Sequence, residues 1–105
     1  MNNPEPDQKD IDFVIAIFSK GQFQKALDEA LEIMKHSQQN AILHNITGAC
    51  YMQLGKLNSA VNSFNDAITI KPDYAKAHYN LGAAYHELNM YQESEKSYRN
   101  SISFD

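Results

Sequence analysis

The chain has 105 residues, of which 43% are hydrophobic and 21% charged, and its formal net charge is −4 at pH 7. This acidic balance, without a basic stripe, argues against nucleic-acid binding, because phosphate contacts need clustered lysine and arginine. Cys50 is the only cysteine, so an internal disulfide is excluded. The N-terminus does not look like a secretory signal, and no apolar run approaches the ~20 residues that span a bilayer. We expect one small soluble unit in the cytoplasm.

Residues 1–6 contain two prolines and little that a core could bury, which predicts a disordered lead-in. Asp7 is a suitable cap for a following helix. The stretch 11–18 is almost wholly apolar and rich in β-branched residues, so its pattern alone fits a buried strand or a buried helix. Gly21 lies 34 residues before Gly55, which ends a predicted helix, and this spacing favours a helix here as well.

The next two elements are amphipathic or end at recognisable stop residues. Residues 22–36 place apolar side chains at steps of three and four, with charges on the other face, which predicts a helix. After the polar connector 37–40, a helix is expected over 41–54, ended by Gly55. Another helix begins near Asn58 and ends before Pro72, which cannot continue it.

The last third repeats this order. Asp73 is expected to cap a helix over 74–88, and Asn89 stands where the two earlier turns have glycine. A final helix is predicted over 91–104. The sequence therefore predicts an all-α chain of six helices in three antiparallel pairs.

An internal repeat relates the middle and the end of the chain. Residues 75–85 align without a gap with residues 41–51, at an offset of 34. Five positions are identical in the two copies: Ala41/Ala75, His44/His78, Gly48/Gly82, Ala49/Ala83 and Tyr51/Tyr85. A fixed offset of this size indicates a repeat architecture in which neighbouring units share one continuous core.

The pattern resembles the tetratricopeptide repeat (TPR), a 34-residue helix–turn–helix unit. Residues 41–74 carry its small, aromatic and closing positions as Gly48, Tyr51, Gly55, Ala60, Phe64, Ala67 and Pro72, and residues 75–105 carry Leu81, Gly82, Tyr85 and Tyr98. Residues 7–40 keep only Gly21 and Ala26 and form a degenerate first repeat. The resemblance implies a right-handed superhelical array of three repeats that binds a protein or peptide in a concave groove.

The third repeat stops one residue before its closing proline, and no clear C-terminal capping helix follows. Arrays of this kind normally end in a helix with a polar outer face. We expect either a fragment of a longer protein or an open end covered by another copy. Two alternative functions follow: an accessory domain that precedes a glycosyl- or sulfotransferase domain, as in some relatives, or a self-associating structural module.

No catalytic, cofactor or metal site is predicted. Cys50 occupies a small packing position beside Gly48 and Ala49, without a base at a meaningful spacing. His44 and His78 are equivalent residues of helices that pack ~8–10 Å apart, too far to share one ion easily. Half-buried packing in place of the family's aromatic residue is the expected role of both. We therefore expect an interaction module without chemistry or cofactors of its own.

The resemblance places the ligand face on the first helix of each repeat. The predicted contacting residues are Ile11, Ile15, Phe18, Asn45, Met52, Lys76, Tyr79 and His86. Some relatives hold the C-terminal carboxylate of chaperone tails with lysine, asparagine and arginine. The corresponding residues here are Ile11, Ile15, Ile46, Lys76 and Asn80, of which only Lys76 is a cation of that set. Chaperone-tail binding is therefore disfavoured.

The first helix has two apolar stripes. Phe13, Val14 and Ile17 are expected to pack onto the neighbouring helices. Ile11, Ile15 and Phe18 are then left facing the groove, where each exposed side chain forgoes ~1.5–3 kcal/mol of burial. An apolar partner segment, or another copy of the chain, is expected to cover them, unless they form an ordinary hydrophobic surface.

Overall fold

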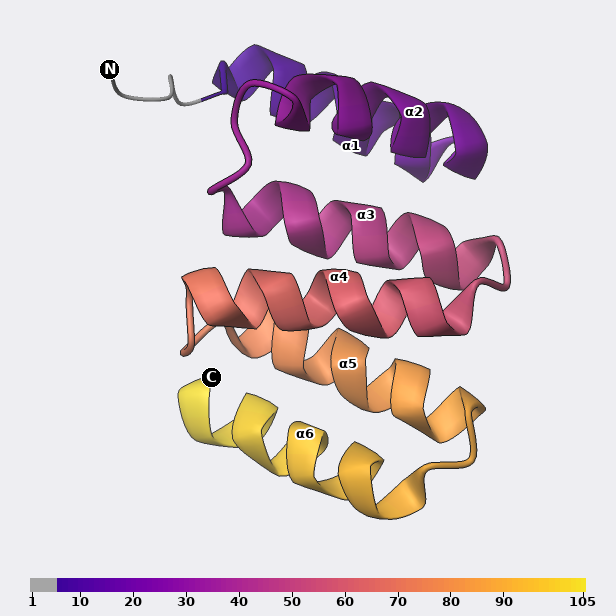
Figure 1. Cartoon of the computed structure of the whole chain (residues 1–105), viewed down its shortest axis with the longest axis vertical. Helices are drawn as coiled ribbons and strands as arrows, with labels where there is room; N and C mark the ends of the chain where they lie inside the picture. Colours follow the sequence, from indigo (N-terminus) through magenta and orange to yellow (C-terminus); the bar gives the residue numbers. More distant parts are fainter. Residues whose placement is uncertain (1–5) are drawn as a thin grey trace.

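Residues 6–105 are described by the computed structural model, and they form six helices. The helices are α1 (Gln8–Ser19), α2 (Phe23–Met34), α3 (Ala41–Gln53), α4 (Leu57–Ile70), α5 (Ala75–Glu87) and α6 (Tyr91–Phe104). The predicted all-α array of antiparallel pairs is confirmed, whereas the predicted disorder concerns residues that, Pro6 apart, lie outside the described part. Figure 1 shows the helices stacked in chain order along the long axis of a body of 39 × 29 × 20 Å.

Three turns within the helix pairs have the same backbone geometry. Gly21, Gly55 and Asn89 all have positive φ, of 79°, 77° and 63°. The residue after each donates its N–H back to the preceding helix, as Lys56 does to the Tyr51 carbonyl at 2.8 Å and Met90 to the Tyr85 carbonyl at 2.8 Å. This left-handed termination explains why glycine, or asparagine in its place, recurs every 34 residues.

The N-terminal caps follow the sequence only in part. Asp7 accepts a hydrogen bond from the Lys9 N–H at 3.0 Å, as expected. Asn40 caps α3 in the same way, through the Leu43 N–H at 3.0 Å. Asp73 does not cap α5, because the helix begins one residue later than expected and Tyr74 takes the cap position without a side-chain bond.

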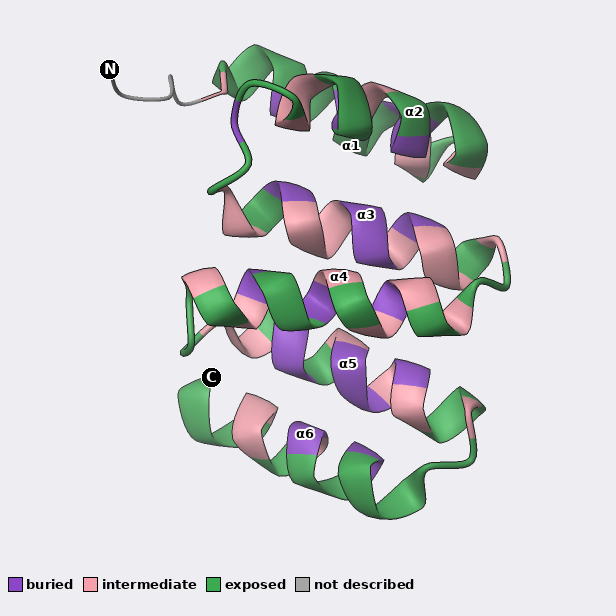
Figure 2. Ribbon diagram, viewed as in Figure 1, coloured by how far each residue is buried: buried purple, intermediate pink, exposed green. Residues whose placement is uncertain are grey.

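The core is continuous along the stack. Each helix packs against the next in the chain, and α1, α3 and α5 also contact one another in succession. One cluster of buried side chains joins α1, α2 and α3, and a second joins α4 and α5 around Phe64. Figure 2 shows the buried residues on the faces where helices meet. Phe64 lies directly against Gly48, and Tyr98 against Gly82, so these glycines permit the closest helix approaches.

The last helix has a mostly polar outer surface. Gln92, Glu95, Lys96 and Arg99 are exposed there, and Arg99 pairs with Glu95 at 2.7 Å. Ile102, 76% exposed, is the main apolar exception. No helix follows α6 within the described residues.

Candidate functional site

The orientation of α1 differs from the sequence expectation at two residues. Ile11 is only 3% exposed and belongs to the core with Val14 and Ile17, whereas Phe13 is 52% exposed. The prediction that Ile11 faces the groove is therefore wrong. Ile11, Val14 and Ile17 are spaced by three, so they share one helical face, and Phe13 lies about 100° away from that face's centre. Ile15 is 43% exposed on the opposite flank, where a ligand can reach it.

A small apolar depression lies between α1 and α3. Its volume is about 90 Å³, and it is lined by Ile15, Phe18, Asn45, Ile46 and Ala49. The Phe18 ring packs edge-on against Phe23, with centroids 5.0 Å apart, and this contact holds the ring at the wall. The structure thus brings together three of the predicted contacting residues, Ile15, Phe18 and Asn45. The volume is suited to an apolar side chain.

Two asparagines connect this depression to the next repeat. The Asn80 amide donates to the Asn45 carbonyl oxygen at 3.0 Å, which joins α5 to α3. Burial raises the pKa of Tyr74, and a side-chain hydrogen bond from Asn45 partly opposes that rise. Asn45 is therefore fixed by neighbours on two sides. Its position in the ligand face was predicted, but its pairing with Asn80 was not, because the two residues are 35 apart and so are not equivalent in the repeat.

A second depression, of about 300 Å³, begins on the far side of this pair. Its lining consists of Ala75, Lys76, Tyr79, Asn80, Ser101 and Asp105. Tyr79 is 57% exposed, and its ring leans on Tyr98 at 5.3 Å. Lys76 supplies a cation and Asp105 an anion, so the depression is polar with one exposed aromatic ring. We call the two depressions and the asparagine pair between them the groove.

Two predicted residues lie outside both depressions. Met52 is half-buried and packs against the second core cluster, which leaves little of it for a ligand. His86 is exposed, but its ring meets Tyr91 edge-on at 5.2 Å, toward the turn that leads into α6. Ile46 and Asn80 line the groove and occupy equivalent positions, 34 residues apart. That equivalence is the sequence signal that identifies them.

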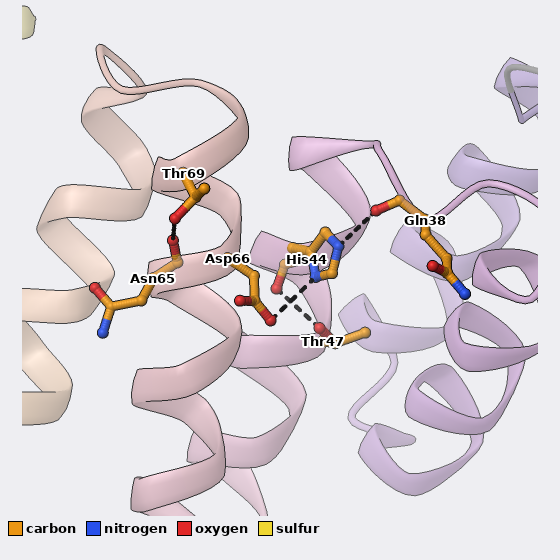
Figure 3. A network of polar contacts seen from close by, with 6 residues as sticks. All are labelled: Gln38, His44, Thr47, Asn65, Asp66 and Thr69. Atoms are coloured by element: carbon orange, nitrogen blue, oxygen red, sulfur yellow. Dashed lines mark hydrogen bonds and ion pairs between the residues drawn. The ribbon is translucent and has the colours of Figure 1, made fainter.

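The two equivalent histidines fasten helices to the connectors before them. His44 Nε2 donates to the Gln38 carbonyl at 2.8 Å, and His78 Nε2 donates to the Pro72 carbonyl at the same distance. Figure 3 shows the His44 ring between the Gln38 carbonyl and Asp66. Among residues 6–105 no three histidine, cysteine or acidic side chains are grouped as metal ligands.

Cys50 is expected to be inert in the folded protein. It is fully buried, and burial raises the pKa of its thiol to about 11. The reactive thiolate is therefore scarce below that pH, and reagents cannot reach the sulfur. At pH 8 we expect no reaction with Ellman's reagent until urea unfolds the chain, and then one thiol per molecule. Rapid modification of the native protein would show that α3 opens locally.

None of the described helices is long and apolar enough to cross a membrane. What the chain offers is a stack of helix pairs with an open face, on which side chains from successive first helices converge. This arrangement defines a helical-repeat protein of the ligand-binding type.

The family comparisons agree with this class. A family model described as "TPR repeat" matches residues 48–89, and one described as "Tetratricopeptide repeat" matches residues 75–105, so that the two together cover more than half of the chain. The chain belongs to the tetratricopeptide repeat family, and its six helices fit three repeats. It is a protein-interaction module. Domains of this family are generally non-catalytic.

Relatives include co-chaperones. Heat shock protein STI1 of Saccharomyces cerevisiae is 30% identical over 93 residues, which are 86% of this chain and 15% of STI1. The Hsp70-Hsp90 organising protein of Plasmodium falciparum is 25% identical over 105 residues, 100% of this chain and 42% of that protein. The chain thus spans less than half of these relatives. The second TPR of Spaghetti (RPAP3), bound to the HSP90 peptide SRMEEVD, has the same fold, with a TM-score of 0.88, 20% identity and coverage of 92% and 90% of the two chains.

Proposed function

We propose that the chain binds an extended segment of a partner protein in the groove, with an apolar side chain of that segment in the α1–α3 depression. The observation that carries this proposal is the Asn45–Asn80 pair, which joins the apolar depression to the polar one. A ligand that contacts both depressions must cross this pair.

The hydrogen-bonding capacity of the pair favours an extended ligand over a helical one. A carboxamide offers two N–H donors and an acceptor oxygen. The mutual bond, whichever way each amide is turned, leaves donor hydrogens on both residues and one oxygen whose acceptor capacity is unused. An extended backbone presents N–H and C=O groups that match these, whereas a helix already uses its own groups internally.

The ends of the groove suggest the ligand's side chains. Filling the apolar depression is worth ~1.5–3 kcal/mol for a side chain of leucine or phenylalanine size. Lys76 and Tyr79 in the second depression suit a carboxylate or polar group, which contributes less because both residues are exposed. Affinity is therefore expected to come mainly from the apolar anchor.

This preference separates the chain from the RPAP3 domain, which binds the acidic peptide SRMEEVD. A carboxylate clamp needs several converging charged donors. At the corresponding positions this chain has buried Ile11, apolar Ile15 and Ile46, and a single cation, Lys76. We propose that acidic C-terminal tails bind weakly here and that internal segments with an apolar anchor bind better.

The test compares two substitutions on the same helix. Random peptides displayed on phage are selected against the wild-type protein, and the winners are measured by calorimetry against Ile15→Asp and the matched control Phe13→Asp. Both residues are exposed, but only Ile15 lines the groove. Losing the apolar contact is expected to weaken binding of groove ligands on the order of 10- to 100-fold in Ile15→Asp.

Phe13→Asp is expected to leave the affinity unchanged. Equal losses in the two variants would contradict the proposal, as would selected peptides without a shared apolar residue. A winning sequence with an acidic C-terminus that loses affinity on amidation would reinstate the carboxylate clamp. Circular dichroism of each variant confirms that the helices remain formed.

A further inference from the structure

The largest hollow in the structure lies away from the groove. It has a volume of about 470 Å³ and lies over His44, between the end of α2 and the end of α4. Its walls include Leu31, Met34, Gln38, His44, Asp66 and Ile70, none of which lines the groove. Figure 3 shows the His44 ring and Asp66 side by side in this region.

The repeat provides an equivalent place to compare, over His78. Both histidine rings are anchored alike, through Nε2 to the carbonyl six residues earlier at 2.8 Å. Over His78, however, the ring of Phe104 packs at 5.3 Å with an interplanar angle of 34°, and His78 is only 6% exposed. Phe104 is the residue 34 positions after Ile70. The molecule therefore covers one of its two equivalent histidines with an aromatic ring of its own.

Two differences keep the place over His44 open. Ile70 stands where the other site has phenylalanine, and it lacks a ring that could cover His44. In addition, α2 ends at Met34, two residues earlier than the position equivalent to the end of α4 at Ile70. The connector 37–40 follows without helical side chains to fill the space.

The charges around the two histidines also differ. Asp66 faces His44 Nδ1 at 3.9 Å, with 64% of its side chain exposed. The equivalent residue near His78 is Asn100, and His78 Nδ1 has no partner within residues 6–105. The one lysine at the rim of the hollow, Lys35, is already paired with Glu32 at 2.8 Å. The open site alone therefore has an anion that a partner's cation can neutralise.

We propose that this hollow is a second docking site, which accepts an aromatic side chain of a partner protein stacked on His44, next to a lysine or arginine that pairs with Asp66. The internal precedent of Phe104 on His78 supplies the aromatic group. The carboxylate of Asp66, and the net charge of −4 of the whole chain, supply the preference for a basic neighbour.

The probes are three capped dipeptides: N-acetyl-Phe-Arg-amide, N-acetyl-Phe-Glu-amide and N-acetyl-Leu-Arg-amide. Ring resonances of the four histidines are followed by NMR during titration, because an aromatic ring stacked on imidazole shifts them. We expect Phe-Arg to shift His44 with a dissociation constant in the millimolar range, as suits so small a ligand. The other two dipeptides should bind several-fold more weakly, and His36, His78 and His86 should stay unchanged.

Two variants make the result specific. Ile70→Phe supplies the ring from within, as Phe104 does over His78, and is expected to abolish the His44 response. Phe104→Ala uncovers His78 and is expected to transfer an aromatic response to that residue. Asp66→Asn should remove the difference between Phe-Arg and Phe-Glu.

Three results would overturn the proposal: no shift of His44 at tens of millimolar Phe-Arg, an unchanged response in Ile70→Phe, or equal shifts of the exposed histidines. Because this site shares no residue with the groove, Ile15→Asp must leave the dipeptide response intact. A loss in that variant would place the dipeptide in the groove instead.

Discussion

Phe64→Ala is expected to lower the free energy of unfolding by about 3–5 kcal/mol, the range for deleting a fully buried aromatic side chain. Phe64 is 0% exposed and is the largest of the fully buried side chains. It contacts Gly48 of α3 and belongs to the cluster that contains Leu81 and Ala84 of α5. Its removal leaves a cavity at the junction of three helices, where the rigid neighbours cannot collapse.

Urea unfolding followed by circular dichroism measures this loss, and Phe13→Ala is the matched control. Phe13 is the same residue type in a helix of similar length, but it is 52% exposed, so its truncation should cost far less. Natural domains are stable by only about 5–15 kcal/mol, and Phe64→Ala should therefore be close to unfolding near body temperature. Equal midpoints for the two variants would show that the central cluster does not hold the repeats together.

Repeat periodicity made the fold readable from the sequence. Gly21, Gly55 and Asn89 share one left-handed backbone position, so their spacing of 34 located three turns before any helix was assigned. Gly48 and Gly82, with Phe64 and Tyr98 opposite, likewise marked where helices come closest. Such positions tolerate few residue types, and for that reason the sequence shows them clearly.

The groove was less readable, because its residues are free to vary. Ile15, Phe18 and Asn45 were predicted correctly to lie on one surface, but Ile11 was misplaced. In α1 nearly every residue of 11–18 is apolar, so hydrophobicity could not tell the buried face from the exposed one. Only the three-residue step of Ile11, Val14 and Ile17, seen against α2 and α3, decides it.

Gly48→Ala is the second substitution with a large expected effect, and its sign is opposite to the usual one. Replacing glycine by alanine inside a helix normally stabilises it by up to about 1 kcal/mol. Here the added Cβ would lie 2.6 Å from Phe64 Cδ1, a distance that real contacts do not reach. Phe64 is buried on all sides and cannot swing away, so α3 and α4 must separate. We expect a net loss of about 2–3 kcal/mol, typical of overpacking.

Gly82→Ala is the built-in comparison for this prediction. Its Cβ would lie 2.7 Å from Tyr98 Cδ1, yet Tyr98 is only half-buried and leans on the exposed Tyr79, so its ring has room to move. The loss should therefore be smaller than for Gly48→Ala, and the displaced ring should disturb Tyr79 and weaken groove binding. In a double-mutant cycle, Phe64→Leu should recover part of the loss in Gly48→Ala, because the shorter side chain makes room for the methyl group. Additive losses in that cycle would show that the methyl group acts elsewhere than on the Phe64 ring.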